Sequence, residues 1–325
     1  MTQPLETAST ATPGLRSQIQ RAGAGRRCAF AAAISIAWFL IACAPAPTSA
    51  PPKFDMGVDP ESWATIPAGE FLFGQHDERV KIDYAYDMMV TDVTNAQYAL
   101  YLNKATADGR IRIANAQVVG AYPGDKFTGR RHEKPIAAGE YLHVPLSAPD
   151  SRLMYDGAQF RFSVKPGYDN HPVAAVTWFG AKAYCDHFGW RLPTEVEWEK
   201  AARGVDGRAY PWGNEIAKNH ANSYNSHDPF EKGVGAQGDT TPVGFYNGRT
   251  YAGYQTLDAT SPFGLYDMAG NVWQWTGDVH AGMHYRFMRG GSKANYEYDL
   301  RAWSRNSAEP DYYGPNVGFR CMRSK

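Results

Sequence analysis

The sequence predicts one irregular domain that mixes short strands with short helices, and it argues against a helical bundle. Glycine and proline turn the chain often, because they contribute 32 and 21 of its 325 residues. Aromatic side chains make up 14% of the chain and provide large apolar surfaces for a core. A chain with many turns and many rings is typical of loop-rich structure packed around aromatic side chains.

The composition restricts both the class of protein and its partners. With 43% hydrophobic and 20% charged residues, the chain is neither disordered nor a polyelectrolyte. Its 33 basic and 33 acidic side chains cancel, so there is no electrostatic reason to expect a nucleic-acid partner. No internal repeat or second linker follows residue 58. We therefore expect residues 59–325 to form a single domain.

Residues 1–42 have the pattern of an export signal. An uncharged apolar run covers residues 28–42 and follows four arginines: Arg16, Arg21, Arg26 and Arg27. The run is too short to cross a bilayer comfortably, but it suits the core of a secretory signal. The pair Arg26-Arg27 leaves a twin-arginine signal open, although the residues after it fit that motif poorly.

The apolar run ends in Leu40-Ile41-Ala42-Cys43, which resembles the lipobox of bacterial lipoproteins. In those proteins the signal is cleaved before the cysteine, whose sulfur then carries lipid. Residues 43–58 are rich in proline and predict an extended tether. We therefore expect a lipoprotein on the periplasmic face of a bacterial membrane, the outer rather than the inner one. The alternative is a plain signal peptide with Cys43 incidental.

Cysteine use agrees with an oxidising compartment. Cys28 is removed with the signal and Cys43 takes the lipid, so Cys185 and Cys321 remain for the fold. Two cysteines in an exported domain most simply form one disulfide. Two buried free thiols are the alternative.

The first half of the domain contains a few clear elements. Residues 66–74 predict a strand that enters a hairpin, and residues 81–89 predict another strand. Thr94 and Gln97 form a capping box, which predicts a helix over 95–102. Residues 105–165 are predicted to form a long irregular insertion. Such an insertion often determines the binding specificity of a domain. Short strand candidates lie within it, near 142–144 and 160–164.

Two short helices are predicted with more definite ends. Thr177 can cap a helix over 178–187, and a capping box of Thr194 and Glu197 opens a helix over 195–203. Glu197 thus has a structural role, and we do not expect it to be catalytic. Three rings of these helices are predicted to lie in the core: Trp178, Tyr184 and Trp198.

A series of motifs runs in order through residues 60–325. Its main members are Asn170-His171-Pro172-Val173; Ala183-Tyr184-Cys185; Arg191-Leu192-Pro193-Thr194-Glu195-Val196-Glu197-Trp198; Gly264-Leu265-Tyr266-Asp267-Met268-Ala269-Gly270-Asn271-Val272-Trp273; Arg289-Gly290-Gly291-Ser292; and Gly318-Phe319-Arg320-Cys321. Together they resemble the formylglycine-generating enzymes, also called sulfatase-modifying factors. The resemblance implies a single α+β domain, an elaborated relative of the C-type lectin fold with little regular secondary structure. It also implies a disulfide between Cys185 and Cys321.

The resemblance does not extend to the reaction. The family oxidises a cysteine of a sulfatase with molecular oxygen, through two cysteines that bind Cu(I) shortly after the Gly-Gly-Ser segment. Here these two positions are Asn295 and Leu300. Neither side chain can replace a soft thiolate ligand, so we expect neither bound copper nor formylglycine synthesis by this route. Two branches of the family share this loss, one PvdO-like and one NirV-like.

The family also implies structural calcium. Its first site maps onto side-chain and backbone oxygens of four residues, Asp267, Gly270, Val272 and Gln274. Hard oxygen ligands suit Ca²⁺, but Gln274 replaces the usual glutamate and should weaken the site. The alternative is a hydrogen-bonded turn. A second site maps onto Asn222 and Ser223, with a carboxylate near residues 235–239.

The family's cleft implies a candidate site on the chain after Gly291. Ser292, Glu297 and Tyr298 are the candidate catalytic groups, as acids, bases or hydrogen-bond donors. Four more residues are expected to line the same cleft: Trp273, Asn295, Tyr296 and Arg301. The alternative is that Tyr296 and Tyr298 simply alternate along a strand.

His280 and His284 suggest a metal site of another kind. Four residues apart, their imidazoles would share one face of a helix, with Asp278 close by. Gly282 argues against a helix, and two surface histidines are the commoner outcome.

Two functions from different classes remain open. The first is an accessory in periplasmic maturation or oxidation that binds a peptide, protein or small aromatic substrate; if it is an enzyme, it is of the oxidoreductase type without the Cu(I) cysteine pair. The second is a non-catalytic binding module that uses the lectin-like scaffold to recognise a partner protein or a glycan.

Overall fold

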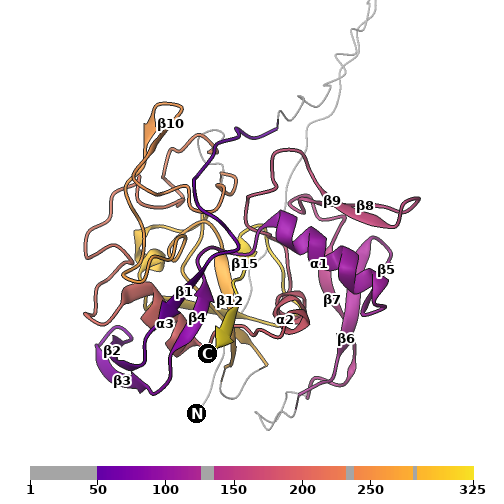
Figure 1. Cartoon of the computed structure of the whole chain (residues 1–325), viewed down its shortest axis with the longest axis horizontal. Helices are drawn as coiled ribbons and strands as arrows, with labels where there is room; N and C mark the ends of the chain where they lie inside the picture. The colour runs from indigo at the N-terminus through magenta and orange to yellow at the C-terminus, as the bar shows by residue number, and fades with distance from the viewer. Residues whose placement is uncertain (1–49, 126–134, 232–237, 281–283) are drawn as a thin grey trace, which may run out of the picture. The chain divides into compact units, whose positions relative to one another are not determined.

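The computed structural model describes residues 50–125, 135–231, 238–280 and 284–325 (Figure 1). The predicted signal peptide and Cys43 lie outside these residues. Within the described ranges, no helix combines the length and the apolar character that a bilayer crossing requires.

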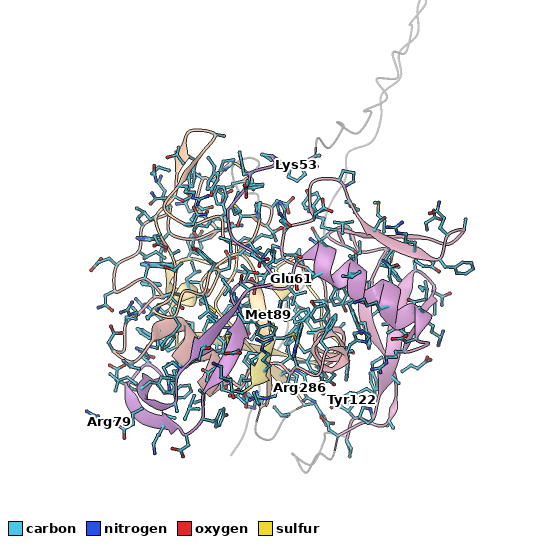
Figure 2. All side chains as sticks on the ribbon, viewed as in Figure 1. Lys53, Glu61, Arg79, Met89, Tyr122 and Arg286 are labelled. Carbon is cyan, nitrogen blue, oxygen red and sulfur yellow. A yellow bond between two sulfur atoms is a disulfide. The ribbon has the colours of Figure 1, made fainter. Side chains whose placement is uncertain are left out.

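A three-stranded sheet joins the start of the domain to its end. Strand β4 (Tyr86–Met89) is central and pairs antiparallel with β1 (Trp63–Ile66) and with β16 (Met322–Ser324). Met89 lies in the interior of the molecule and is 1% exposed (Figure 2). Residues near the two ends of the domain therefore share one sheet.

The single strand predicted over 81–89 is wrong. Strand β3 (Glu78–Ile82) pairs with β2 (Gly69–Phe73), whereas β4 belongs to the sheet with β1 and β16. Because the two strands pair in different sheets, the chain must change direction between them. The hairpin predicted near residues 66–74 is confirmed.

The three predicted helices are confirmed with their caps. Helix α1 (Asn95–Ala107) and helix α3 (Glu195–Arg203) each begin with the predicted capping box, and Thr177 caps α2 (Trp178–His187). Helix α1 continues beyond the predicted end, because buried Leu102 and Ala105 extend its apolar face. Cys185 on α2 forms a disulfide with Cys321, as predicted.

The segment 105–165 is more regular than predicted. It contains a three-stranded sheet of β5 (Ile111–Ala114), β6 (Gln117–Tyr122) and β7 (Gly139–Pro145). A separate hairpin of β8 (Leu153–Asp156) and β9 (Arg161–Val164) follows. The two strand candidates near 142–144 and 160–164 are confirmed as β7 and β9. Figure 1 shows this sheet beside α1 and α2.

A four-stranded sheet carries the candidate site. Its order is β14–β13–β12–β15, and its long central strand β12 (Trp273–Val279) pairs antiparallel with β13 (Arg286–Arg289). The edge strands are β14 (Arg305–Ala308) and β15 (Val317–Gly318). The candidate residues after Gly291 lie on the connection from β13 to β14, which includes a short 3₁₀ helix, η1 (Glu297–Leu300). A small hairpin, β10 (Thr250–Tyr251) and β11 (Tyr254–Gln255), completes the elements of the described part.

Aromatic side chains fill the core, as the composition predicted. Trp178, Tyr184 and Trp198 are all buried, so their predicted place in the core is confirmed. The largest apolar cluster gathers residues of α1, α2, β12 and the insertion sheet. This mixture of helices and strands is the α+β structure that the sequence implied.

The tether predicted over 43–58 is too long. Met56 is 5% exposed, and the ring of Phe54 lies 5.3 Å from that of Tyr251. The carbonyl of Met56 accepts hydrogen bonds from Asn247 and Arg249. Residues 54–56 thus pack on the domain, because the apolar side chains of Phe54 and Met56 fit among its aromatic rings.

Candidate functional site

Ser292 is buried at the centre of a partly buried hydrogen-bond network. It follows β13 closely and is 0% exposed. Its hydroxyl donates to Asn295 Oδ1 at 2.6 Å and accepts from Asn316 Nδ2 at 2.9 Å. Asn295 Nδ2 in turn donates to Asp299 Oδ2 at 2.8 Å. The network holds the start of the candidate loop against the segment before β15.

The two positions that match the copper cysteines are both engaged in structure. The Asn295 amide uses its oxygen toward Ser292 and its nitrogen toward Asp299. Leu300 is 0% exposed and packs in a small apolar cluster with Tyr210, Ala221 and Ala269. After residue 43 the sequence contains two cysteines, Cys185 and Cys321. They form the disulfide, so no thiol is available at this loop.

Glu297 and Tyr298 lie on the outer side of the same loop. Tyr296 and Tyr298 are 58% and 59% exposed. The ring of Tyr224 lies 4.8 Å from that of Tyr296, and the Arg301 guanidinium lies 4.6 Å from the Tyr298 ring. The alternative that the two tyrosines alternate along a strand is wrong, because η1 begins at Glu297 and turns Leu300 inward.

The structure thus divides the predicted site residues into two groups. Ser292 is buried, and Trp273 is 5% exposed within the main apolar cluster. Tyr296, Glu297 and Tyr298 lie at the surface instead. The single cleft expected to hold all of them is not formed by these side chains. Among the described residues, no hydrogen bond reaches the Glu297 carboxylate, so it has no partner that would orient it as an acid or base.

Two cavities border the loop. A cavity of about 420 Å³ contacts Tyr298 and Asp299 and reaches the β2–β3 hairpin at His76. A smaller one, of about 160 Å³, contacts Lys293 and Pro315. A ligand bound at the exposed tyrosines would have the larger cavity beside it.

A network of buried charges that the sequence analysis missed lies beside the larger cavity, whose wall includes Glu199 and Arg289. Arg289 donates to Glu199 and lies 3.3 Å from Glu195, and Arg203 donates to Glu199 at 3.0 Å. Burial raises the pKa of Glu195. Glu195, Glu199 and Arg203 stand four residues apart on α3, so one helix face carries two carboxylates followed by a guanidinium, and both carboxylates contact Arg289 of β13. That spacing is the signal that could have revealed the network.

A second cluster lines the smaller cavity, and of its members the sequence analysis indicated only Asp239, within the range given for a calcium carboxylate. Asp239 accepts from Arg152 at 3.1 Å and from Tyr168 at 2.6 Å. Lys293, 5% exposed, donates to the carbonyl of Gly238 at 2.9 Å. These residues come from distant parts of the chain, so no local pattern pointed to them.

The first predicted calcium site does not fit the ion. Gln274 Oε1 accepts from Trp198 at 2.7 Å and from Arg320 Nε at 2.8 Å. Gln274 Nε2 donates to the carbonyl oxygen of Asp267 at 2.7 Å. The side-chain oxygen of Gln274, which was expected to bind calcium, therefore already accepts from two donors, and one of them is the buried guanidinium of Arg320. The hydrogen-bonded alternative describes this turn.

The charge at this place comes from Arg320, which is 0% exposed. All five of its N–H groups have acceptors. Besides Gln274, the guanidinium bonds to Asp92 at 3.3 Å and to three carbonyls: Met89, Val90 and Tyr266. Burial raises the pKa of Asp267 to about 6. With five hydrogen bonds, the Arg320 guanidinium holds these segments together, which is the structural role that a bound metal ion would have.

The second predicted calcium site is only partly described, because residues 235–237 lie outside the described ranges. Asn222 donates through Nδ2 to the carbonyl of Asp239 at 2.9 Å, and its own carbonyl accepts from Asn271 at 2.8 Å. The Ser223 carbonyl accepts from Ser226. The Asp239 carboxylate is bonded to Arg152 and Tyr168. Calcium at this place stays a prediction.

The helix considered for His280 and His284 would include residues 281–283, which lie outside the described ranges. His280 follows β12 and His284 precedes β13, and their connection includes residues outside the described ranges. The Asp278 carboxylate accepts from the backbone N–H of Glu195 at the start of α3. No group of three histidine, cysteine or acidic residues in the described part is arranged to hold a metal.

Comparison with known proteins agrees with the order of the motifs. Residues 51–325 match the sulfatase-modifying factor enzyme 1-like domain. The formylglycine-generating enzyme of Mus musculus is 30% identical over 296 residues, which cover 79% of this chain and 73% of that protein. The serine/threonine-protein kinase pkn1 of Chlamydia caviae is 35% identical over 284 residues. This chain spans only 37% of the length of that kinase.

A solved structure shows the same fold. PvdO from Pseudomonas aeruginosa aligns with a TM-score of 0.52 at 20% identity, over 81% of this chain and 94% of PvdO. The fold implied by the motifs is thereby confirmed. By both sequence and fold, the chain belongs to the sulfatase-modifying factor enzyme 1-like (formylglycine-generating enzyme-like) domain family.

Proposed function

We propose that this protein is an exported, lipid-anchored member of the family that does not make formylglycine with copper. It binds a peptide, protein or small aromatic substrate beside residues 292–301 and acts as an accessory in periplasmic maturation or oxidation. One observation carries the proposal: the two thiolate positions hold Asn295, whose amide is hydrogen-bonded at both ends, and Leu300, which is packed in a core. Neither can bind Cu(I), which requires soft ligands.

The proposed place of substrate binding is the exposed aromatic surface of the loop, formed by Tyr224, Tyr296, Tyr298 and Arg301. Aromatic and arginine side chains supply much of the energy at protein recognition sites. Rings that are 58% and 59% exposed can lose water on contact with a ligand, and the Arg301 cation can stack on an aromatic group. The adjoining cavity of about 420 Å³ offers room for a side chain or a small molecule.

The exposed tyrosines equally favour the second function, a non-catalytic binding module. They make a binding surface without supplying an oriented acid, base or metal. In this case the domain recognises a partner protein or a glycan, and no compound in the cell depends on a reaction at the loop.

The proposed export and anchoring depend on the first 43 residues. The arginine-rich start, the apolar run 28–42 and Cys43 support a lipoprotein signal, and the outer membrane is the proposed location. Residues 44–50 are then proposed as a short spacer, because Pro51 is already buried and lies close to Gly167.

One experiment separates these proposals in the native host, with the gene disrupted and variants supplied in trans. We expect Cys43→Ser to move the protein from the membrane fraction to the soluble fraction. A Tyr296→Ala/Tyr298→Ala double variant should lose both the substrate captured by crosslinking and the compound that disappears on disruption. The matched control is Tyr312→Ala/Tyr313→Ala, because these tyrosines are 45% and 42% exposed outside the loop.

Glu297→Gln then distinguishes the accessory from the binding module. If Glu297 takes part in chemistry at the loop, this variant keeps capture but loses the compound that disappears on disruption; if the protein only binds, capture is unchanged and disruption removes no compound. Full function of the Tyr296→Ala/Tyr298→Ala variant would contradict both proposals.

A further inference from the structure

The turn of the β8–β9 hairpin presents an aromatic ring to solvent. Phe160 is 74% exposed, more than any other large apolar side chain of the described residues. Its neighbours in the turn, from Gly157 to Arg161, are exposed as well. Figure 1 shows the hairpin extending past α1 at the edge of the domain. A turn usually carries small or polar residues, so a phenyl ring at this place requires an explanation.

The backbone at Phe160 is strained. Its φ angle is +50°, in the left-handed region that a bulky side chain rarely adopts and that glycine or asparagine adopts more readily. Asp156 fixes the turn, because its Oδ1 accepts from the N–H groups of Ala158 at 2.9 Å and Gln159 at 3.2 Å. The exposed ring contributes little packing that would offset this strain. Strain of this kind is often kept at functional positions.

The base of the hairpin is held firmly on α1. The Asn103 amide bonds twice to the backbone of Phe162, through Nδ2 to its carbonyl at 3.0 Å and through Oδ1 from its N–H at 2.7 Å. Leu153 and Phe162 are each 2% exposed and belong to the main apolar cluster. The exposed turn is therefore presented on a fixed support.

The chain from the proposed lipid anchor joins the domain beside this hairpin. Pro51 is buried, and a Cβ atom on Gly167 would lie 2.9 Å from Pro51 Cδ. Strand β9 ends at Val164, shortly before Gly167. The segments 44–50 and 161–167 can each extend to at most about 25 Å. An anchor at Cys43 would thus hold the domain close enough to a membrane for the hairpin turn to reach its surface.

We propose that the turn of the β8–β9 hairpin is a second membrane contact, in which Phe160 enters the headgroup region of the phospholipid bilayer that holds the anchor. The inference rests on the proposed lipid anchoring. A bilayer suits a single ring on a short turn, because it buries the ring without a matching pocket. Aromatic side chains favour this region of a membrane. The tether raises the effective concentration of the bilayer, so one ring is enough for contact.

The test places a nitroxide spin label beside the intact ring. With Cys43 lipidated and the other two cysteines in their disulfide, Ala158→Cys gives the mature chain one free thiol. The full lipidated protein is reconstituted into vesicles of phosphatidylethanolamine and phosphatidylglycerol. Electron paramagnetic resonance then measures collisions of the label with oxygen, which is enriched in lipid, and with a water-soluble nickel chelate. We expect oxygen collisions to dominate at residue 158.

Two comparisons make the result specific. Adding Phe160→Asn should move the label at residue 158 into water, so that nickel collisions dominate, and should not lower the melting temperature, because asparagine accepts a positive φ angle. Arg79→Cys is the control for position. The Arg79 side chain is 82% exposed, and Figure 2 shows Arg79 at the opposite side of the molecule from Lys53, near the point where the tether joins. A label there should stay in water.

Mass spectrometry of the purified chain shows separately whether Cys43 carries lipid. A chain without lipid overturns the anchoring and this proposal with it. If the chain is lipidated, dominant nickel collisions at residue 158 overturn the membrane contact alone. Low collision rates with both reagents do so too, because they show that another protein surface covers the turn. A label that stays in lipid after Phe160→Asn, or a variant that melts well below the wild type, would also contradict the role given to the ring.

Discussion

Single residues at helix starts gave the most reliable predictions. Thr94 and Thr194 cap their helices as the sequence indicated, because a capping box needs only residues three apart in the chain. Glu197 makes hydrogen bonds beyond those of the capping box. It also accepts two hydrogen bonds from Arg191, at 2.8 and 2.5 Å, and one from Tyr84 at 2.7 Å. The structural role assigned to it from the sequence is therefore strengthened.

Glu197→Gln should destabilise the domain, and the effect should depend on pH. Burial alone would raise the Glu197 pKa, but bonds from Arg191 and the Thr194 backbone outweigh it and lower the pKa to about 2. A lowered pKa stabilises the fold above the unfolded value near 4.5, and this contribution disappears as the pH falls through about 2. We expect Glu197→Gln to cost about 1–3 kcal/mol at pH 7.

Urea unfolding between pH 7 and pH 2 measures this effect. Glu70→Gln is the control, because the Glu70 side chain is 64% exposed and lies 3.8 Å from Arg79. The difference between wild type and Glu197→Gln should shrink below the unfolded pKa near 4.5. A difference that stays constant down to pH 2 would show that the Glu197 charge is not involved.

The chemistry of the candidate loop could be predicted from single residues only in part. The sequence located Asn295 and Leu300 where the relatives have thiols, and the structure gives both residues structural partners. It did not reveal that Ser292 and Trp273 would be buried while Glu297 and Tyr298 lie outside. That division arises from η1 and from Asn316, which is distant in the sequence and bonds to Ser292.

At the scale of elements, local signals predicted the helices well and the strands less well. A helix contains its own hydrogen bonds, so its caps and apolar face determine it. A strand depends on a partner elsewhere in the chain. The insertion 105–165 therefore read as irregular, although Ile111 pairs with Gly120 and Tyr141 pairs with Gly120 on its other side. For the same reason the break between β3 and β4 was missed.

Gln274 joins several elements, and its removal should be costly. Gln274→Met would leave Trp198 Nε1, Arg320 Nε and the Asp267 carbonyl without their buried partner. We expect the free energy of unfolding to fall by about 2–4 kcal/mol. Gln159→Met, at an exposed position of the β8–β9 turn, is the control. Chemical unfolding with and without calcium measures the change.

The same experiment examines the misfit of calcium at this turn. Because Arg320 and Gln274 already satisfy the buried groups, calcium and EDTA should leave the difference between wild type and Gln274→Met unchanged. If EDTA destabilises the wild type as much as the substitution does, and has no further effect on Gln274→Met, then calcium and not the amide organises this turn.

At the scale of the whole molecule, the ends of the domain are tied to its middle. Strand β16 pairs with β4, and Cys321 just before it is bonded to Cys185 on α2. Counting cysteines was enough to predict this disulfide, because only two remain once the first 43 residues are set aside. The start of the domain was harder to place, since proline-rich residues 50–58 look like a tether until Phe54 and Met56 meet their aromatic pocket.

The central proposal is that this chain keeps the fold of the family without its copper chemistry. The fold depends on dispersed packing and on the motifs, which the chain retains. The proposed loss of the reaction rests on the two positions at which the resemblance places thiols, which hold Asn295 and Leu300 here. Fold and family therefore follow from the whole sequence, whereas activity rests on two positions.

The most direct measurement is mass spectrometry of a cysteine-containing sulfatase peptide incubated with the purified full-length protein, copper, a thiol reductant and air. The formylglycine-generating enzyme of Mus musculus serves as the positive control. The account predicts that this protein leaves the peptide cysteine unchanged at every copper concentration, whereas the control converts it. Conversion of the cysteine to the aldehyde by the wild-type chain, above a blank with copper alone, would contradict it.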